Sequence, residues 1–129
     1  MESENTVNLP MVSVILVNYN GEGFIADCLN SLKEIAYPTE MYEVILVDNA
    51  SKDGSIKLIR ESFPWVKLIP LDRNTGFSEG NNAGVKEARG EYIVFLNTDT
   101  TVEKNWLSEL VKKIQSDDRI GACSSQVLY

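Results

Sequence analysis

The sequence predicts an α/β fold in which a mostly parallel sheet carries helices on both faces. Short apolar, β-branched runs alternate along the chain with segments whose apolar residues recur at helical spacing. Such alternation is typical of parallel strands joined by crossover helices. The length of 129 residues, 43% of them hydrophobic, fits one domain with a buried core. We therefore expect a single domain over residues 1–129, with residues 1–10 as a flexible N-terminal segment.

The first strand–helix unit and the second strand lie in the N-terminal part of the chain. Residues 11–17 form an apolar run that predicts a strand buried on both faces. Residues 22–36 are amphipathic and predict a helix, which Pro38 cannot extend. Residues 42–47 predict the second strand, closed by a polar turn.

The same alternation continues to the end of the sequence. A second helix carries apolar side chains at Ile56, Leu58, Ile59 and Phe63. Ser51 or Asp53 is expected to cap its first turn. The remaining elements are, in order, a strand over 66–71, a helix over 78–89 ending near Gly90, a buried strand over 91–96, a helix over 104–115 and a fifth strand over 119–128.

Composition excludes several classes of site. Twelve basic against nineteen acidic residues give a net charge of −7, so the chain lacks the basic surface of a general nucleic-acid binder. Histidine is absent, which removes histidine triads and histidine metal sites. Cys28 and Cys123 have no CxxC spacing and favour two buried thiols over a disulfide or a reactive site. No apolar run has the length of a membrane span, so we expect a soluble, cytoplasmic protein, at most peripheral at the inner membrane face.

Polar residues follow three of the predicted strands. They are Asn18 to Asn20 after the first strand, Asp48 and Asn49 after the second, and Asn97 and Asp99 after the fourth. In open α/β sheets, ligands bind beyond the carboxyl ends of the strands, where the strand order reverses. The pattern predicts a binding crevice there, although polar residues also end strands simply because loops are polar.

Three nucleotide or phosphate signatures fit the sequence poorly. No GxxxxGK[ST] loop is present, and Gly21 and Gly23 give a GxG without the third glycine of a dinucleotide fingerprint. A phosphoacceptor receiver domain has a similar length and predicts phosphorylation at Asp48. Such domains carry an acidic pair after the first strand, where this chain has Asn18 and Asn20.

Four motifs in order carry a more specific likeness. They are VSVILVNYN (12–20), VDNASKDGS (47–55), NTGFSEGNNAG (74–84) and FLNTDT (95–100). Together they resemble family 2 glycosyltransferases of the GT-A fold, a Rossmann-like sheet, and most closely the rhamnosyltransferase-like branch. The likeness covers about residues 11–128. It implies the donor-binding half of such an enzyme, truncated after the fifth strand.

The resemblance assigns a nucleotide diphosphate sugar, UDP- or dTDP-linked, to these motifs. Val17 and Tyr19 would line the base pocket, and Asp48 would accept a hydrogen bond from the base N3–H with support from Asn49. Asp99 matches the last position of the DxD motif and would bind Mg²⁺ or Mn²⁺, which bridges the diphosphate. Asn97 takes the first position of that motif, where an amide can bond a ribose hydroxyl.

The loop and helix over 74–84 would close over the nucleotide. Gly76 and Gly80 would allow close backbone approach, and Asn81 and Asn82 would contact the donor or lie on the helix surface.

The implied reaction is inverting transfer of a sugar to the hydroxyl of a glycan or lipid-linked acceptor, as in cell-surface polysaccharide synthesis. No residue here matches the family's general base, so another segment or partner would supply it. A sheet edge left exposed by truncation would favour self-association. The alternative is a non-catalytic nucleotide-binding or interaction module that lacks the acceptor half, and turnover would distinguish the two.

Overall fold

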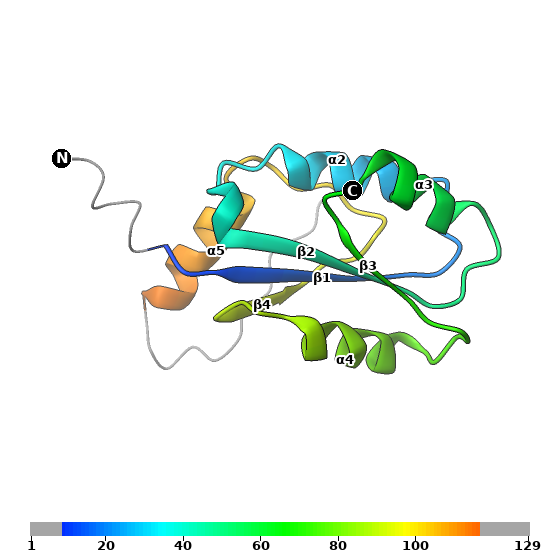
Figure 1. The fold of residues 1–129 in the computed structure, drawn as a ribbon. Coiled ribbons are helices and arrows are strands. Elements are labelled where there is room, and N and C mark those ends of the chain that lie inside the picture. Colours follow the sequence, from blue (N-terminus) through cyan, green and yellow to red (C-terminus); the bar gives the residue numbers. More distant parts are fainter. Residues whose placement is uncertain (1–8, 117–129) are drawn as a thin grey trace.

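The computed structural model describes residues 9–116, which form a four-stranded parallel sheet with helices on both faces (Figure 1). The strand order is β3-β2-β1-β4, and every neighbouring pair is parallel. The strands are β1 (Val12–Asn18), β2 (Tyr42–Asp48), β3 (Lys67–Pro70) and β4 (Tyr92–Phe95). The order reverses between β1 and β4, because β1 leads to β2 on one side and β4 lies on the other. The predicted α/β class is confirmed.

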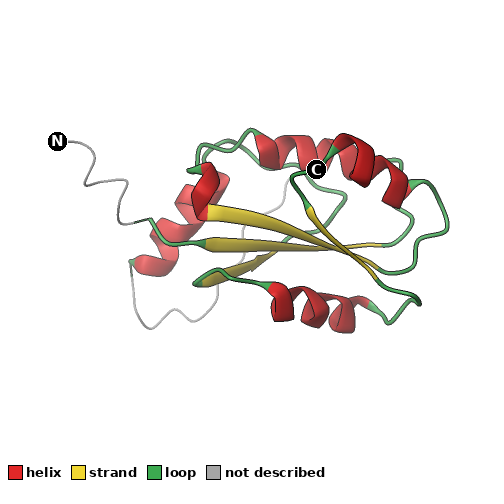
Figure 2. Ribbon diagram, viewed as in Figure 1, coloured by secondary structure: helices red, strands yellow, loops and turns green. Residues whose placement is uncertain are grey.

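The helices form two unequal layers (Figure 2). They are α2 (Ile25–Lys33), the 3-10 turn η1 (Thr39–Met41), α3 (Ser55–Ser62), α4 (Phe77–Glu87) and α5 (Trp106–Gln115). Side chains of α2, α3 and α5 share one core with the sheet, whereas α4 packs on the opposite face of β1 and β2. None of the helices in the described part of the chain is long and apolar enough to cross a membrane.

The alternation of side chains along β1 separates the two faces. Val12, Val14 and Leu16 point into the core shared with α2, α3 and α5. Ile15 lies on the α4 face, where α4 comes so close that a Cβ at Gly84 would lie 2.7 Å from Ile15 Cγ2. Glycine is therefore required at this contact.

Several predicted elements differ in detail. The first helix is shorter than 22–36, spanning Ile25–Lys33, because residues 22–24 form a turn that bonds back to the Gly21 carbonyl. Gly90 does not end a helix, since α4 stops at Glu87. Its amide donates to Ser13 Oγ at 2.8 Å, and a Cβ there would come within 2.5 Å of the Ser13 nitrogen.

The fourth strand is less buried than the sequence predicts. Ile93 and Phe95 are 38% and 54% exposed, whereas Val94 faces the main core. The register pairs Ile93 with Ser13 and Phe95 with Ile15, which places both on the α4 face. Helix α4 covers β1 and β2 on that face rather than β4. The predicted strand over 119–128, Cys123 and most of the predicted N-terminal segment lie outside the described residues.

Candidate functional site

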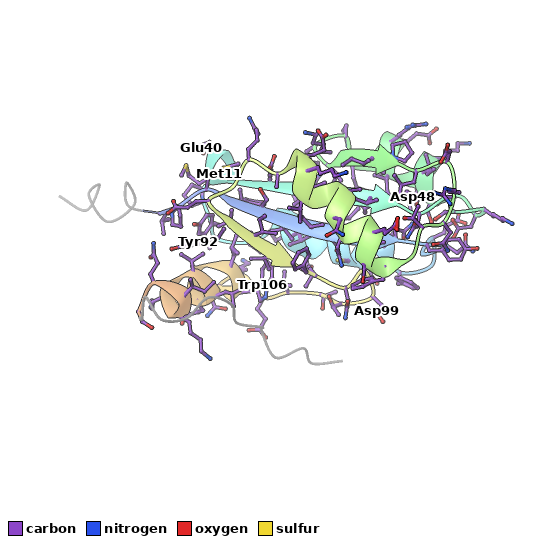
Figure 3. The ribbon with its side chains drawn as sticks, turned by 90° about the horizontal axis from the view of Figure 1, so that it is seen from below. Met11, Glu40, Asp48, Tyr92, Asp99 and Trp106 are labelled. Atoms are coloured by element: carbon purple, nitrogen blue, oxygen red, sulfur yellow. The ribbon has the colours of Figure 1, made fainter. Side chains whose placement is uncertain are left out.

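The polar residues singled out by sequence gather at one end of the sheet. In Figure 3, Asp48 and Asp99 lie at the same end, and Met11, Glu40 and Tyr92 mark the other. Asn18 and Asp48 are register partners at the carboxyl ends of β1 and β2. The Asn97–Thr100 turn follows β4 on the other side of β1. These residues therefore lie where the strand order reverses, which is where ligands bind in this class of sheet.

Asp48 is the centre of a buried hydrogen-bond network. Its Oδ1 accepts from Asn18 Nδ2 at 2.9 Å and from Ser51 Oγ at 2.8 Å, and its Oδ2 accepts from the Ser51 amide at 2.8 Å. Asp48 is 0% exposed. The expected hydrogen bond from a base N3–H to Asp48 stays a prediction, and it requires a rearrangement that exposes the buried carboxylate.

Asn49 fixes the loop that leads into α4. Its Oδ1 accepts from the Thr75 amide at 2.8 Å, and its Nδ2 donates to the Gly76 carbonyl at 2.9 Å. Gly76 has a φ of 92° at the N-terminus of the helix. Because Asn49 is only 2% exposed, it supports the site from below rather than forming its surface.

The loops after β1 and β2 are clasped together by reciprocal hydrogen bonds. Asn20 Oδ1 accepts from the Lys52 amide at 2.7 Å, and the Asn20 amide donates to Ser51 Oγ at 2.8 Å. Asp53 Oδ2 accepts from the Glu22 amide at 3.0 Å, and the Gly54 amide donates to Glu22 Oε1 at 2.9 Å. We call this set of contacts the loop clasp.

Hydrogen bonds from Ser55 and from the loop clasp lower the pKa of Asp53. Burial acts to raise the pKa of Asp53, but hydrogen bonds from Ser55 and the Glu22 amide outweigh it and hold that pKa below its usual value. Its Oδ1 accepts from the Ser55 amide and hydroxyl. The helix begins after Gly54, so of the two expected caps Asp53 bonds its first residue, whereas the Ser51 hydroxyl serves the network around Asp48.

Tyr19 and Val17 lie beside this network. Tyr19 directly follows β1 and is 46% exposed, so its ring can stack on a ligand. Val17 faces α4, where a Cβ at Gly80 would lie 2.9 Å from Val17 Cγ1. The close approach expected at Gly80 is therefore an approach of helix to sheet, and the backbone of Gly80 is not free to meet a ligand.

The two asparagines of α4 occupy different flanks of the helix. Asn82 lines a groove of about 590 Å³ between α4 and the end of β3, together with Leu71, Thr75 and Glu79. Successive residues turn by about 100° in a helix, so Asn81 lies on the flank opposite Glu79. Asn81 is half-buried.

Asn97 and Asp99 are exposed on the turn after β4. Thr100 is 4% exposed and its hydroxyl donates to the Asn97 carbonyl at 2.7 Å. The buried Cys28 thiol donates to the same carbonyl at 3.8 Å. Burial, and then the negative charge of Asp99, raises the pKa of Cys28 to about 12, so the thiol stays protonated and unreactive.

A divalent cation fits this site only in part. Among residues 9–116, no group of three or more histidine, cysteine, aspartate or glutamate side chains converges on one point. An exposed carboxylate such as Asp99 suits a hard cation that takes its other ligands from phosphate and water. The residues present therefore fit a cation carried by a diphosphate and do not form an all-protein cage.

The structure adds Thr75 and Thr100, which sequence reasoning did not select. Together with Asn18 and Ser51 they hold the loops that carry the exposed groups. The Asn18 Oδ1 atom is buried and has no hydrogen-bond donor among the described residues. Asn18 ends a buried strand, which is a signal that the sequence provides, but the partners of Asn18 and Thr75 lie in segments distant in the sequence and depend on the fold.

Comparisons with known proteins agree on one family. Residues 13–129 match the family model described as Glycosyl transferase family 2. Glycosyltransferase AglE of Haloferax volcanii is 33% identical over 112 residues, which are 84% of this chain and 37% of that protein. The chain thus spans about a third of the length of this relative.

Two solved structures share the fold. S. aureus TarS 1-349 in complex with UDP superposes with a TM-score of 0.75 at 29% identity, over 82% of this chain and 32% of that one. Mannosyltransferase PcManGT from Pyrobaculum calidifontis, in complex with GDP-Man and Mn²⁺, gives 0.80 at 29% identity, over 91% and 36%.

Proposed function

The chain belongs to glycosyl transferase family 2, and we propose that the end of the sheet formed by β1, β2 and β4 is the donor half of an inverting glycosyltransferase site. The donor is a nucleotide diphosphate sugar, UDP- or dTDP-linked, bound together with Mg²⁺ or Mn²⁺. One observation carries the proposal: Tyr19 and Asp99 are exposed on loops that flank the reversal of strand order, and both loops are fixed from below.

The nucleoside occupies the end formed by β1 and β2. The Tyr19 ring stacks on the base and the backbone of Val17 lines the pocket, with Asn81 on the facing flank of α4. Asp48 and Asn49 set the positions of these walls through their buried hydrogen bonds, and Asp48 receives the base N3–H when the loop clasp opens. The UDP in the TarS structure supports this class of donor.

The diphosphate occupies the end formed by the turn after β4. Asp99 holds the cation, and Asn97 bonds a ribose hydroxyl through its amide. When bound, the cation supplies Lewis-acid stabilisation of the departing diphosphate. This arrangement explains how a domain with a net charge of −7 can hold an anion. The Mn²⁺ in the PcManGT structure supports it.

The transfer is a single in-line displacement at the anomeric carbon. The hydroxyl of a glycan or lipid-linked acceptor forms the new bond while the bond to the nucleotide diphosphate breaks, without a covalent enzyme intermediate. The general base that removes the hydroxyl proton lies outside the matched motifs. Within the family, we assign the chain to the rhamnosyltransferase-like branch on its DNAS, GFSEGNNAG and LNTDT stretches.

Calorimetric titration with UDP and dTDP, with and without Mn²⁺, tests the donor site. The expected result is binding that needs Mn²⁺ and is lost in Asp99→Ala. Asp72→Ala, which removes an exposed carboxylate from the loop after β3, serves as the control. Absence of binding by a folded wild-type chain contradicts the proposal, and binding that Asp99→Ala leaves unchanged contradicts the role of Asp99. Turnover with a donor sugar then separates an enzyme from a non-catalytic binding module.

A further inference from the structure

The segment between β4 and α5, which carries Asp99, is attached to α2 and to the residues that follow this helix. The Cys28 thiol donates to the Asn97 carbonyl at 3.8 Å. The Val102 amide donates to Ser31 Oγ at 3.1 Å, and the Ala36 amide donates to the Lys104 carbonyl at 2.8 Å. The path of this segment is therefore set largely by a helix that precedes it by some seventy residues.

Of these three hydrogen bonds, the one between Ser31 and Val102 involves a side-chain hydroxyl. The Ser31 Oγ donates to the Cys28 carbonyl at 2.7 Å, one turn earlier in α2, and accepts from the Val102 amide. The first bond fixes the rotamer of the hydroxyl, and the second uses that fixed oxygen to hold the segment.

Asp99 itself is exposed and lies between fixed points. The Asn97 carbonyl is held by Cys28 and Thr100 on one side, and the Val102 amide is held by Ser31 on the other. The location of the Asp99 carboxylate therefore depends on how these neighbours are anchored. A carboxylate that shares a cation with a diphosphate must be placed closely, because misplacement of about 1 Å is costly.

We propose that Ser31 is a positioning residue, which sets the location of the Asp99 carboxylate by anchoring Val102 to α2. The inference rests on the proposed donor site and adds a residue that no motif contains. Helix α2 begins directly after the loop that carries Tyr19, since the Gly21 carbonyl accepts from the Phe24 and Ile25 amides. One rigid helix thus spaces the nucleoside end of the site from its diphosphate end.

The chain offers a matched control for the test. Ser108 lies in α5 and its hydroxyl also donates to the carbonyl three residues earlier, that of Asn105, at 3.1 Å. Ser31→Ala and Ser108→Ala therefore remove the same local bond, but only Ser31→Ala frees the Val102 amide. Ser31→Thr keeps the hydroxyl and serves as the rescue.

Two ligands separate the two ends of the site. UDP with Mn²⁺ reports the diphosphate end, and UMP without metal reports the nucleoside end. We expect Ser31→Ala to weaken UDP–Mn²⁺ binding about fivefold, the effect of one ordinary hydrogen bond, with UMP binding unchanged. Ser31→Thr and Ser108→Ala should bind both ligands as the wild type does. Equal UDP–Mn²⁺ affinity in Ser31→Ala and the wild type overturns the proposal.

Amide hydrogen exchange keeps the two proposals apart. If the wild-type chain binds no UDP, the proposed donor site fails, and exchange at Val102 decides the role of Ser31. Faster exchange of that amide in Ser31→Ala than in Ser108→Ala supports anchoring. The same rate in both variants contradicts it.

Discussion

Asn18 and Asp48 end adjacent parallel strands in register, and their side chains join the strands by a buried 2.9 Å hydrogen bond. Both residues are 0% exposed. This pair fixes the separation of the two loops at the point where each leaves the sheet. It also gives the site a polar floor away from solvent, where a hydrogen bond is stronger and an unpaired group more costly than in water.

Placing a second carboxyl in this pair should destabilise the fold. Asn18→Asp replaces the donor with a group that repels Asp48, and we expect a loss of about 3–5 kcal/mol at pH 7. Because protonation relieves the repulsion, the difference from the wild type should shrink near pH 4. Urea denaturation at both pH values measures it. Asn20→Asp, exposed and still an acceptor for the Lys52 amide, should change stability by less than about 0.5 kcal/mol.

Ala50 adopts a left-handed backbone conformation, with a φ of 63°, in the turn after β2. A side chain in this region is strained, so Ala50→Gly should raise stability by about 0.5–1 kcal/mol. The same change at Ala83, within α4, should lower it by about 0.5–1 kcal/mol. Thermal denaturation of both variants gives the comparison. A loss of equal size at the two positions would contradict strain at Ala50.

The contact between α4 and the sheet should not tolerate a methyl group. A Cβ at Gly84 would lie 2.7 Å from Ile15 Cγ2 and 3.3 Å from Val47 Cγ2, so we expect Gly84→Ala to cost about 1–3 kcal/mol. At Gly23 a Cβ meets nothing within 4 Å, and Gly23→Ala should be neutral or stabilising. Chemical denaturation midpoints measure both. A neutral Gly84→Ala would show that α4 can move away from the sheet freely.

Stability should fall in alkaline solution because of Cys28. Its pKa rises from a reference of 9.0 to about 12, with burial as the main cause and the Asp99 charge as the second. Above pH 9 the unfolded thiol ionises while the folded one does not, so the unfolded state holds fewer protons and stability is lost as pH rises toward 12.

The slope of unfolding free energy against pH tests this assignment. Between pH 9 and 10 the slope should be shallower in Cys28→Ala, although the cavity lowers stability at every pH. Tyr37, whose pKa is also raised to about 12, mainly by burial, adds a loss of the same sign at higher pH in both proteins. If the wild type and Cys28→Ala show equal slopes between pH 9 and 10, ionisation of Cys28 does not cause the loss of stability.

Strand positions were predictable because β-branched apolar runs are local signals. The run over 11–17 is shifted by one residue from β1, and the run over 42–47 ends one residue before β2 does. The exposure of Phe95 was not predictable, since it depends on which strands α4 covers. Gly90 was misassigned for the same reason: its role is contact with Ser13, which is 77 positions away in sequence.

Of the candidate site, the sequence predicts the location but not the hydrogen bonds. That polar groups meet at one edge follows from strand order, which the alternation of elements makes predictable. The exchange of hydrogen bonds among Asn18, Asp48 and Ser51 requires the register of β1 against β2. No local pattern encodes that register, and this is why Asp48 was expected at the surface of the pocket.

The loop clasp restricts insertions and deletions in the loops that follow β1 and β2. Asn20 and Glu22 bond Lys52, Asp53 and Gly54 through backbone amides, so one inserted or deleted residue in either loop would move every later partner out of reach. Related sequences should therefore differ in these two loops by substitutions rather than by insertions or deletions. Residues 71–74, beyond β3, take no part in the clasp and are the place where an insertion could be accommodated.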